Sequence, residues 1–411
     1  MDLIAEEFVD RLLTKEASKQ PCDNVRPDEL VMELPHDFDE KKFNRGREFF
    51  SEHRYSLSST MMLGLVAVFS VPSILQVLIG SRHSSSVYTA YKRYLSTLLH
   101  TVSWFDYELK PGTLSWRSLY TVRSRHLRAS QASKLKDIAV ISQRDLALTQ
   151  FGFFGFCMLK PDNFGVRQLR DGDWDAYNYF WRVIGYMIGL EDRYNICRST
   201  FYETREVCQV LQDRVFTPAL ENVPEHFEHM ARVMLDGIQF INPTVETDGF
   251  LYLCRYLADV PGYIYTEDDR MRLQNRLSKH LKGKSLDTGV DVSYLMRPAA
   301  VDGLPKRPPR LLYYKDYETI EEAPAYKQLK LRARHKLFIF HLTMCINSTY
   351  RGRLLMNFIF TLKLLVMKYF PYTAFSKLGF KKSFVNIFEE DPSDDTKPRL
   401  NEEYHITNEF F

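Results

Sequence analysis

The sequence has no pair of cysteines spaced as Cys-x-x-Cys, although it contains six cysteines. They lie far apart along the chain, so neither a zinc knuckle nor a disulfide framework is expected, and free thiols in a reducing compartment are predicted. The chain also lacks an excess of either charge, with 55 Lys and Arg against 52 Asp and Glu and a net charge of +3. This balance gives no strong field for a polyanion, and we expect no nucleic-acid partner.

Several motifs of enzymes and secreted proteins are also missing. The sequence contains no Gly-x-Ser-x-Gly nucleophile elbow and no P-loop, and "GFFGF" at 152–156 lacks the third glycine of a dinucleotide fingerprint. The amino-terminal "MDLIAEEFVDRLL" mixes acids into an amphipathic pattern, unlike a signal peptide. Asn347-Ser348-Thr349 is a glycosylation sequon that matters only in the secretory lumen. We therefore expect an intracellular protein that is not secreted.

Aromatic and other apolar residues are abundant. Hydrophobic residues make up 45% of the 411 residues, and the aromatic ones include 29 Phe and 24 Tyr, enough for a large apolar interior. Apolar positions recur at spacings of three and four from Val87 to Val102 and again from Trp174 to Ile188, which indicates helices. Strict alternation is scarce. The sequence therefore predicts an all-α protein with a single large helical domain.

Two long apolar segments stand out. Met61 to Gly80 has 20 residues without a charge, enough to span a bilayer. Pro72 lies inside it and predicts a break, so a buried helix pair is the alternative to a membrane-inserted segment. In Arg351 to Phe375, Lys363 and Lys368 interrupt the apolar run. This pattern is typical of an amphipathic helix lying on a membrane surface or on the protein core.

Changes in composition divide the chain into three parts. Residues 1–60 are predicted to form a helical amino-terminal extension, and residues 61–303 the central domain. Residues 304–411 are predicted to form a carboxyl-terminal extension that contains the amphipathic helix. It begins with the proline-rich linker "LPKRPPRLLYY" at 304–314 and ends in the polar, acidic "EEDPSDDTKPRLNEEYH", which we expect to be mobile.

One histidine lies in a basic stretch, "SWRSLYTVRSRHLRAS". His126 is flanked there by Arg123, Arg125 and Arg128. Neighbouring cations disfavour the charged form of an imidazole, and a neutral imidazole is what a metal ion or a haem iron requires. His126 is therefore a candidate iron ligand, with an ordinary structural histidine as the alternative.

A second candidate pair precedes this stretch. Arg93 and Thr97 are four residues apart, so they share one face of the predicted helix. That face lies at the edge of the apolar stripe, where a half-buried arginine requires an anion such as a carboxylate or a haem propionate. An ordinary salt bridge is the alternative for Arg93.

These motifs together resemble a known family. It contains the fungal endoplasmic-reticulum-bound oxygenase of mycophenolic acid biosynthesis and the bacterial rubber oxygenase, or latex clearing protein. The resemblance spans roughly residues 60–260 and rests on Arg93-x-x-x-Thr97, "TVRSRH" ending in His126, "ISQRDLALTQFGFFGFCML" from Ile141, and "YFWRVIGYMIGLEDRYNIC" from Tyr179. Of these, "FWRVIGYMIGLEDRYN" is similar to the animal branch of the family.

The resemblance implies a fold, a cofactor and an activity. It implies a globin-like helical core at residues 61–303 that binds a b-type haem. It also implies dioxygen-dependent cleavage of a carbon–carbon double bond in an isoprenoid or other lipid-like substrate, at or near the endoplasmic reticulum membrane. His126 matches the axial haem ligand, and Arg93 and Thr97 match a catalytic pair beside the haem. The implied partners are a hydrophobic small molecule, dioxygen and a membrane surface.

The sequence departs from the rubber-cleaving members at two positions. Those members have a lysine immediately before the threonine, where this chain has Ser96. They also have a glutamate upstream of the arginine, proposed as a base, where this chain has "LQVLIG" with only Gln76 as a polar side chain. The resemblance therefore supports haem binding more directly than rubber cleavage.

The departures support a second hypothesis. The chain could be a non-catalytic helical protein that retains the fold and binds a lipid or a protein partner. Arg93 and His126 would then belong to a buried polar network with acidic neighbours such as Asp106 or Asp145. A carboxylate bonded to His126, with no cavity beside it, would favour this hypothesis.

Overall fold

A computed structural model describes residues 2–23, 25–135, 140–260, 262–263, 300–305 and 323–406 of the chain. These residues form helices joined by turns and loops, and extended backbone pairs at one isolated bridge among them, Pro21 with Ser142. Buried apolar side chains from most of the helices join in one large hydrophobic cluster, and a smaller second cluster joins residues from 91–102 and 364–374. The predicted all-α class, with a single helical domain, is confirmed.

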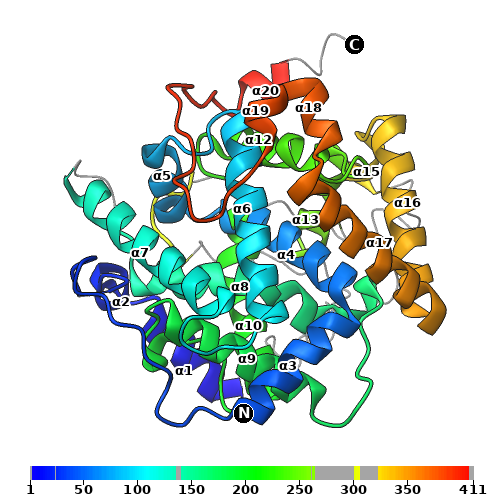
Figure 1. Cartoon of the computed structure of the whole chain (residues 1–411). Helices are drawn as coiled ribbons and strands as arrows, with labels where there is room; N and C mark the ends of the chain where they lie inside the picture. The colour runs from blue at the N-terminus through cyan, green and yellow to red at the C-terminus, as the bar shows by residue number, and fades with distance from the viewer. Residues whose placement is uncertain are drawn as a thin grey trace, which may run out of the picture.

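Many of the helices follow one another with short connections, whereas the connecting segments 20–39 and 384–402 are long (Figure 1). The first half of the chain forms α1 (Asp2–Leu12), α2 (Lys15–Lys19), α3 (Glu40–Glu52), α4 (Arg54–Val68), α5 (Pro72–Ser81), α6 (Val87–Asp106), α7 (Leu114–Leu135) and α8 (Gln143–Leu159). The next part forms η1 (Pro161–Phe164), α9 (Asp173–Met187), η2 (Asp192–Tyr194), α10 (Phe201–Leu211), η3 (Gln212–Phe216), α11 (Thr217–Glu221), α12 (Phe227–Gln239) and α13 (Thr247–Leu257). The last part forms α15 (Pro324–Lys327), α16 (Leu331–Ser348), α17 (Tyr350–Tyr369), α18 (Tyr372–Leu378), α19 (Phe380–Ser383) and α20 (Glu403–Ile406).

Helix α8 lies at the centre of the fold. Almost all of its residues are buried, as expected for a helix that is apolar on every side. Helix α4 packs along it and approaches very closely, since a Cβ atom on Gly64 would lie 2.0 Å from the carbonyl oxygen of Gly152. The first glycine of "GFFGF" at 152–156 therefore permits this helix crossing.

The apolar segment from Met61 to Gly80 is broken as Pro72 predicts. Helix α4 ends at Val68, α5 begins at Pro72, and the two helices are bent by 95°. Most side chains of α4 are buried in the protein. Within the described residues no single helix is long and apolar enough to cross a membrane. By length and composition alone, two bent pairs meet that requirement, α4 with α5 and α17 with α18.

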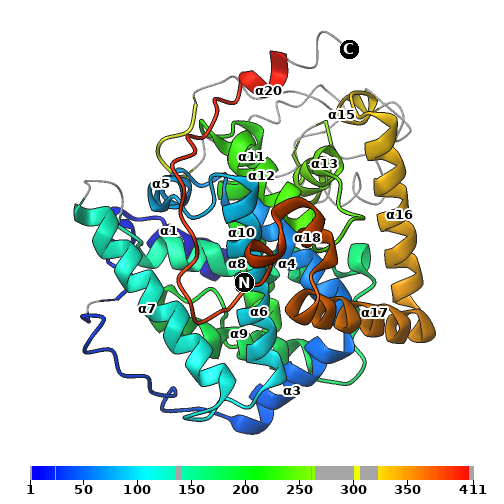
Figure 2. The same cartoon turned by 45° about the horizontal axis from the view of Figure 1, so that its top comes forward.

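Helices α6 and α7 lie side by side on one flank of the core (Figures 1 and 2). The sequence fixes the start of α6, because the Ser86 hydroxyl accepts from the backbone N–H of Thr89 and the Thr89 side chain caps Ser86 in return. Some of the side chains that α6 and α7 bury in the core are polar, at positions where a core-facing helix usually has apolar side chains. This arrangement creates the site described below.

Both predicted extensions contribute to the central core. Phe49 of α3 and Phe340 of α16 belong to the same buried cluster as α8, and α3 packs along α9. Most of the proline-rich linker at 304–314 lies outside the described residues. The three-part division of the chain stays a prediction.

Candidate functional site

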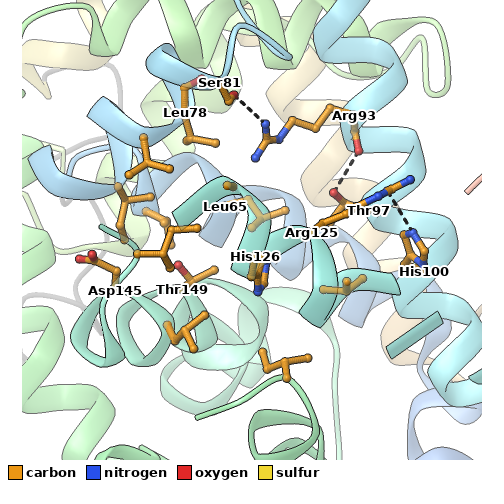
Figure 3. Close-up of a pocket in the computed structure, with 18 of the residues that line it drawn as sticks. Leu65, Leu78, Ser81, Arg93, Thr97, His100, Arg125, His126, Asp145 and Thr149 are labelled. Carbon is orange, nitrogen blue, oxygen red and sulfur yellow. Dashed lines mark hydrogen bonds between the residues drawn. The ribbon is translucent and has the colours of Figure 1, made fainter. Parts of the chain in front are cut away.

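A cavity of about 490 Å³ lies among α4, α5, α6, α7, α8 and α9. Its wall is mostly apolar and includes Val122, Phe153 and Ile184, together with Leu65 and Leu78, which are labelled in Figure 3. Polar side chains enter the same wall from α6 and α7. A volume of this size, an apolar lining and a few converging polar groups are typical of sites for small molecules and cofactors.

His126 of α7 is part of this wall. Its Nδ1 atom is buried and has no hydrogen-bond partner among the described residues. The ring is surrounded by protein yet keeps some accessible surface, because that surface faces the cavity. Burial, reinforced by Arg93 and Arg125, lowers the pKa of His126 to about 4. The imidazole is therefore neutral at pH 7.

The cations that act on His126 differ in part from the expected ones. Arg125 is one of them, and Arg93 of the neighbouring helix is the other. Arg123, which the sequence pattern also suggested, instead places its Nε 2.6 Å from the Asp23 carboxylate. Helical spacing alone does not predict this difference, since residues three apart lie on the same face of a helix. The Asp23 carboxylate, from the amino-terminal part of the chain, engages the Arg123 guanidinium instead.

Two further histidines line the cavity, and both are engaged. His100 is buried, with Nδ1 2.7 Å from Ser118 Oγ and Nε2 3.4 Å from the Arg125 guanidinium (Figure 3). Burial and Arg125 lower its pKa to about 3. His83 has Nδ1 3.2 Å from the Pro392 carbonyl oxygen. Among the histidines of this cavity, His126 is therefore the one with no hydrogen bond at either ring nitrogen within the described residues.

Arg93 and Thr97 of α6 also line the cavity. The Arg93 guanidinium donates to Ser81 Oγ at 3.2 Å, and the backbone carbonyl oxygen of Arg93 accepts from the Thr97 hydroxyl at 3.0 Å (Figure 3). In the part of the chain that the structure describes, no carboxylate lies within 4 Å of Arg93. The ordinary salt bridge considered for Arg93 is therefore not formed among the described residues, and its guanidinium lines the cavity.

Residues 384–399, here called the strap, cross α6 and α7 at the edge of the cavity (Figures 1 and 2). Arg125 Nη2 donates to the carbonyl oxygens of Ile387, at 3.1 Å, and Glu389. Its Nη1 lies 3.9 Å from the Asp391 carboxylate. Glu390 and Asp391 are part of the cavity wall. The polar tail that we expected to be mobile instead lies against the body of the protein.

Other contacts hold the strap on both sides of the cavity. The Arg117 guanidinium stacks on the Phe388 ring at 4.6 Å from its centroid. Beyond the cavity, Arg82 Nη1 pairs with the Asp395 carboxylate at 2.6 Å. The Ser86 hydroxyl also bonds to an Asp carboxylate of the strap at position 394. The acidic composition of this segment thus matches the arginines beneath it.

The acidic residues suggested as partners of His126 do not contact it. Asp145 lines the cavity, but its carboxylate accepts from Ser73 Oγ at 2.7 Å and from the Ser142 N–H at 3.2 Å, where it caps α8. Asp106, at the end of α6, pairs with Arg54. The buried network of the non-catalytic hypothesis is therefore not formed by these two residues.

The two departures from the rubber-cleaving members occupy different environments. Ser96 is buried in the cavity wall, and its hydroxyl has no partner among the described residues. Gln76 is exposed on α5 and does not belong to the wall. The cavity therefore has a small neutral side chain at the position where the resemblance to the rubber-cleaving members would place a lysine.

Several residues of the wall were not predicted from the sequence. His100 and Trp104 follow Arg93 by seven and eleven residues, so they lie on the face of α6 that Arg93 and Thr97 define. Extending that face by two turns would have found them. The strap carries no such signal, because its approach to the cavity depends on contacts between residues far apart in the sequence.

The donor set of the cavity fits a haem better than a free metal ion. No group of three or more His, Cys, Asp and Glu side chains in the described regions could hold a metal ion. A haem needs one neutral imidazole and cations for its propionates, which His126, Arg93 and Arg125 provide. The pattern differs from the usual one in that Nδ1 of His126 lacks the partner that normally orients a metal-bound ring.

Comparison with known proteins gives one distant likeness. No family model matches this chain, and no curated protein matches it. Among solved structures, latex clearing protein in its closed state aligns with a TM-score of 0.44 and 18% sequence identity. The alignment covers 73% of this chain and 87% of that protein.

Proposed function

We propose that the cavity binds a b-type haem with His126 as the axial ligand. In this proposal the protein is a haem-dependent oxygenase of the family that its motifs resemble, in the animal branch, and cleaves a carbon–carbon double bond of an isoprenoid or other lipid-like substrate. One observation carries the proposal: a neutral histidine with no hydrogen bond lies in the wall of an apolar cavity, beside Arg93, which has no carboxylate partner among the described residues.

Each polar residue of the cavity has a role in this proposal. The haem, when bound, supplies the iron at which dioxygen is activated. His126 would hold the iron, and Arg93 and Arg125 would bind the propionates through charge-assisted hydrogen bonds. The Thr97 hydroxyl donates its proton to the Arg93 carbonyl oxygen. Towards the cavity this hydroxyl can therefore act only as a hydrogen-bond acceptor. We assign Arg93 and Thr97 to catalysis, while the apolar wall binds a hydrocarbon chain and excludes water.

The proposal places the protein inside the cell, and the resemblance suggests the endoplasmic reticulum membrane. All six cysteines are free, which supports a reducing compartment. Asn347 of the sequon is fully buried, and its side-chain amide donates to Ser56 Oγ at 2.5 Å. A glycosylating enzyme could not reach this side chain in the folded protein.

An absorption spectrum tests the haem directly. The full chain, produced with haem supplied, should show a Soret band, and His126→Ala should remove that band without changing the far-ultraviolet circular dichroism. His83→Ala is the matched control, because His83 also lines the cavity but already bonds to Pro392. No Soret band in the unsubstituted protein would refute the haem, and a band that survives His126→Ala would refute the ligand.

A non-catalytic lipid-binding protein is the second candidate function. Ser96 stands where the rubber-cleaving members have a lysine, and the Asp145 carboxylate is engaged in helix capping, so neither position supplies a free acid or base to the cavity. This candidate predicts purified protein that binds a long-chain lipid with neither a Soret band nor consumption of oxygen on a polyene. Oxygen uptake that depends on both haem and a polyene would exclude it.

A further inference from the structure

Helices α16 and α17 carry large apolar side chains on their outward faces. They meet at Thr349 and form one edge of the molecule in both views (Figures 1 and 2). Phe338 is 65% exposed and Phe358 is 66% exposed. The six residues that we call the apolar face follow one another at intervals of four, one stripe on each helix: Phe338, Leu342, Ile346, Leu354, Phe358 and Leu362.

The opposite sides of the same helices are packed against the protein. Leu337 and Phe340 of α16 and Leu364 and Met367 of α17 are buried in the core. Both helices are therefore apolar on two sides, and only one side is covered. Contiguous exposed apolar patches of this kind mark sites of interaction with a partner or a membrane. The packing also keeps α17 flat on the protein surface.

The charge of this region identifies the partner. From Ala323 to Phe388 the sequence contains 12 Lys and Arg and no Asp or Glu. The other 43 basic residues of the chain are outnumbered by 52 acidic ones, so positive charge is concentrated here. None of the 12 comes within 4 Å of a carboxylate of another described residue. Exposed members include Lys330 and Arg332 at the start of α16 and Arg351 and Lys368 near the ends of α17.

We propose that the apolar face docks on a lipid membrane that carries anionic headgroups. Apolar side chains would enter the boundary between headgroups and acyl chains, and the surrounding Lys and Arg would reach the phosphates and carboxylates. A second copy of this chain fits poorly, because the region from 323 to 388 has 12 basic and no acidic residues, and two such regions would repel one another. This proposal does not depend on haem binding, so either can fail without the other.

Vesicle flotation with the full chain tests the proposal. The protein should bind vesicles of phosphatidylcholine with phosphatidylserine, bind vesicles of phosphatidylcholine alone much more weakly, and lose binding as salt is raised. Removing two cations in Arg351→Gln/Lys368→Gln should weaken binding about fivefold for each cation. Leu354→Gln/Phe358→Ser/Leu362→Gln, which changes three exposed side chains, should abolish flotation while the protein stays folded by circular dichroism.

A matched control lies elsewhere on the surface. Tyr202→Ser/Arg205→Gln changes one exposed aromatic residue and one exposed cation on α10 and should leave vesicle binding unchanged. Unaltered flotation of the triple variant would overturn the proposal. Failure of the unsubstituted protein to float would also overturn the proposal. This holds both if the protein elutes as a monomer and if it elutes as a dimer that the triple variant disrupts.

Discussion

At the scale of single residues, burial decides the protonation of the internal histidines more than neighbouring charge does. Burial is the first cause of the lowered pKa of His53, His100 and His126, and an arginine adds to it in each case. What differs is the use of the ring nitrogens. His53 and His100 hold structural hydrogen bonds, whereas His126 holds none among the described residues. A structural histidine and a candidate ligand are thus told apart by their partners.

His53 allows a prediction about pH and stability. It is fully buried, its Nε2 lies 2.9 Å from the Arg167 carbonyl oxygen, and burial together with Arg353 lowers its pKa to about 4. In the unfolded chain the His53 imidazole is protonated near pH 6.5, whereas in the folded chain it stays neutral down to about pH 4. The contribution of His53 to stability is therefore fully present above pH 6.5 and is lost as the pH falls towards 4. Between pH 7 and pH 5 the free energy of unfolding should fall by roughly 2 kcal/mol through His53 alone.

Urea unfolding of His53→Gln at both pH values measures this contribution. The glutamine amide can replace the Nε2 donor but does not titrate, so the variant should lose about that part of the pH dependence. His335→Gln removes an exposed histidine and should leave the pH dependence as it is in the unsubstituted protein. An identical pH dependence in His53→Gln would show that His53 does not contribute.

The sequence identified residues of the cavity better than it identified their partners. Arg93, Thr97 and His126 were singled out from helical spacing and from a resemblance, and the structure brings all three to one cavity. Their roles stay predictions. The neighbours were harder, because Arg125 and Arg123 are equally basic in sequence. Only tertiary contacts, such as the pairing of Arg123 with Asp23, separate the arginine that acts on His126 from the other. Local periodicity thus predicts a face, while tertiary packing decides which charge acts on it.

At the scale of elements, the crossing of α4 and α8 shows what helical periodicity leaves open. The sequence predicted the break at Pro72, because proline has no N–H to donate within a helix. It could not predict that Gly64 and Gly152 face one another, since both are simply small residues within apolar runs. Close approach of two backbones depends on pairing distant segments, and spacing within each segment carries no information about that pairing.

This crossing should be intolerant of a single added carbon. In Gly64→Ala the new Cβ would lie 2.0 Å from the carbonyl oxygen of Gly152, so α4 and α8 would have to move apart. We expect the free energy of unfolding to fall by about 1–3 kcal/mol or more, although alanine favours helix formation. Urea unfolding measures this loss of stability. Ser59→Ala on the half-buried side of α4 is the control and should change stability by less than about 0.5 kcal/mol, and equal midpoints for the two variants would contradict the crossing.

At the scale of the whole molecule, the strap joins the carboxyl-terminal segment to the cavity. Its path over α6 and α7 is held by matching charge, with Arg125 bonded to strap carbonyl oxygens and Asp391 3.9 Å from the same guanidinium. Glu390 and Asp391 therefore stand where an anionic group of a ligand would approach the cavity arginines. An acidic tail is typical of a mobile segment when it is considered alone, and only the complementary surface beneath it gives it a fixed place.

If the strap carboxylates compete with a ligand for these arginines, neutralising them should favour anionic ligands selectively. Glu390→Gln/Asp391→Asn removes the charge but keeps the backbone contacts, and a loose surface ion pair contributes up to about 1 kcal/mol. A long-chain fatty acid should then bind up to about fivefold more tightly, while the corresponding fatty alcohol should bind as before. Asp395→Asn is the matched control, because Asp395 belongs to the strap but pairs with Arg82 away from the cavity. Calorimetric titration distinguishes the outcomes: an equal gain for the alcohol would mean that the strap blocks entry by its bulk, and no gain for the acid would mean that its charge does not guard the cavity.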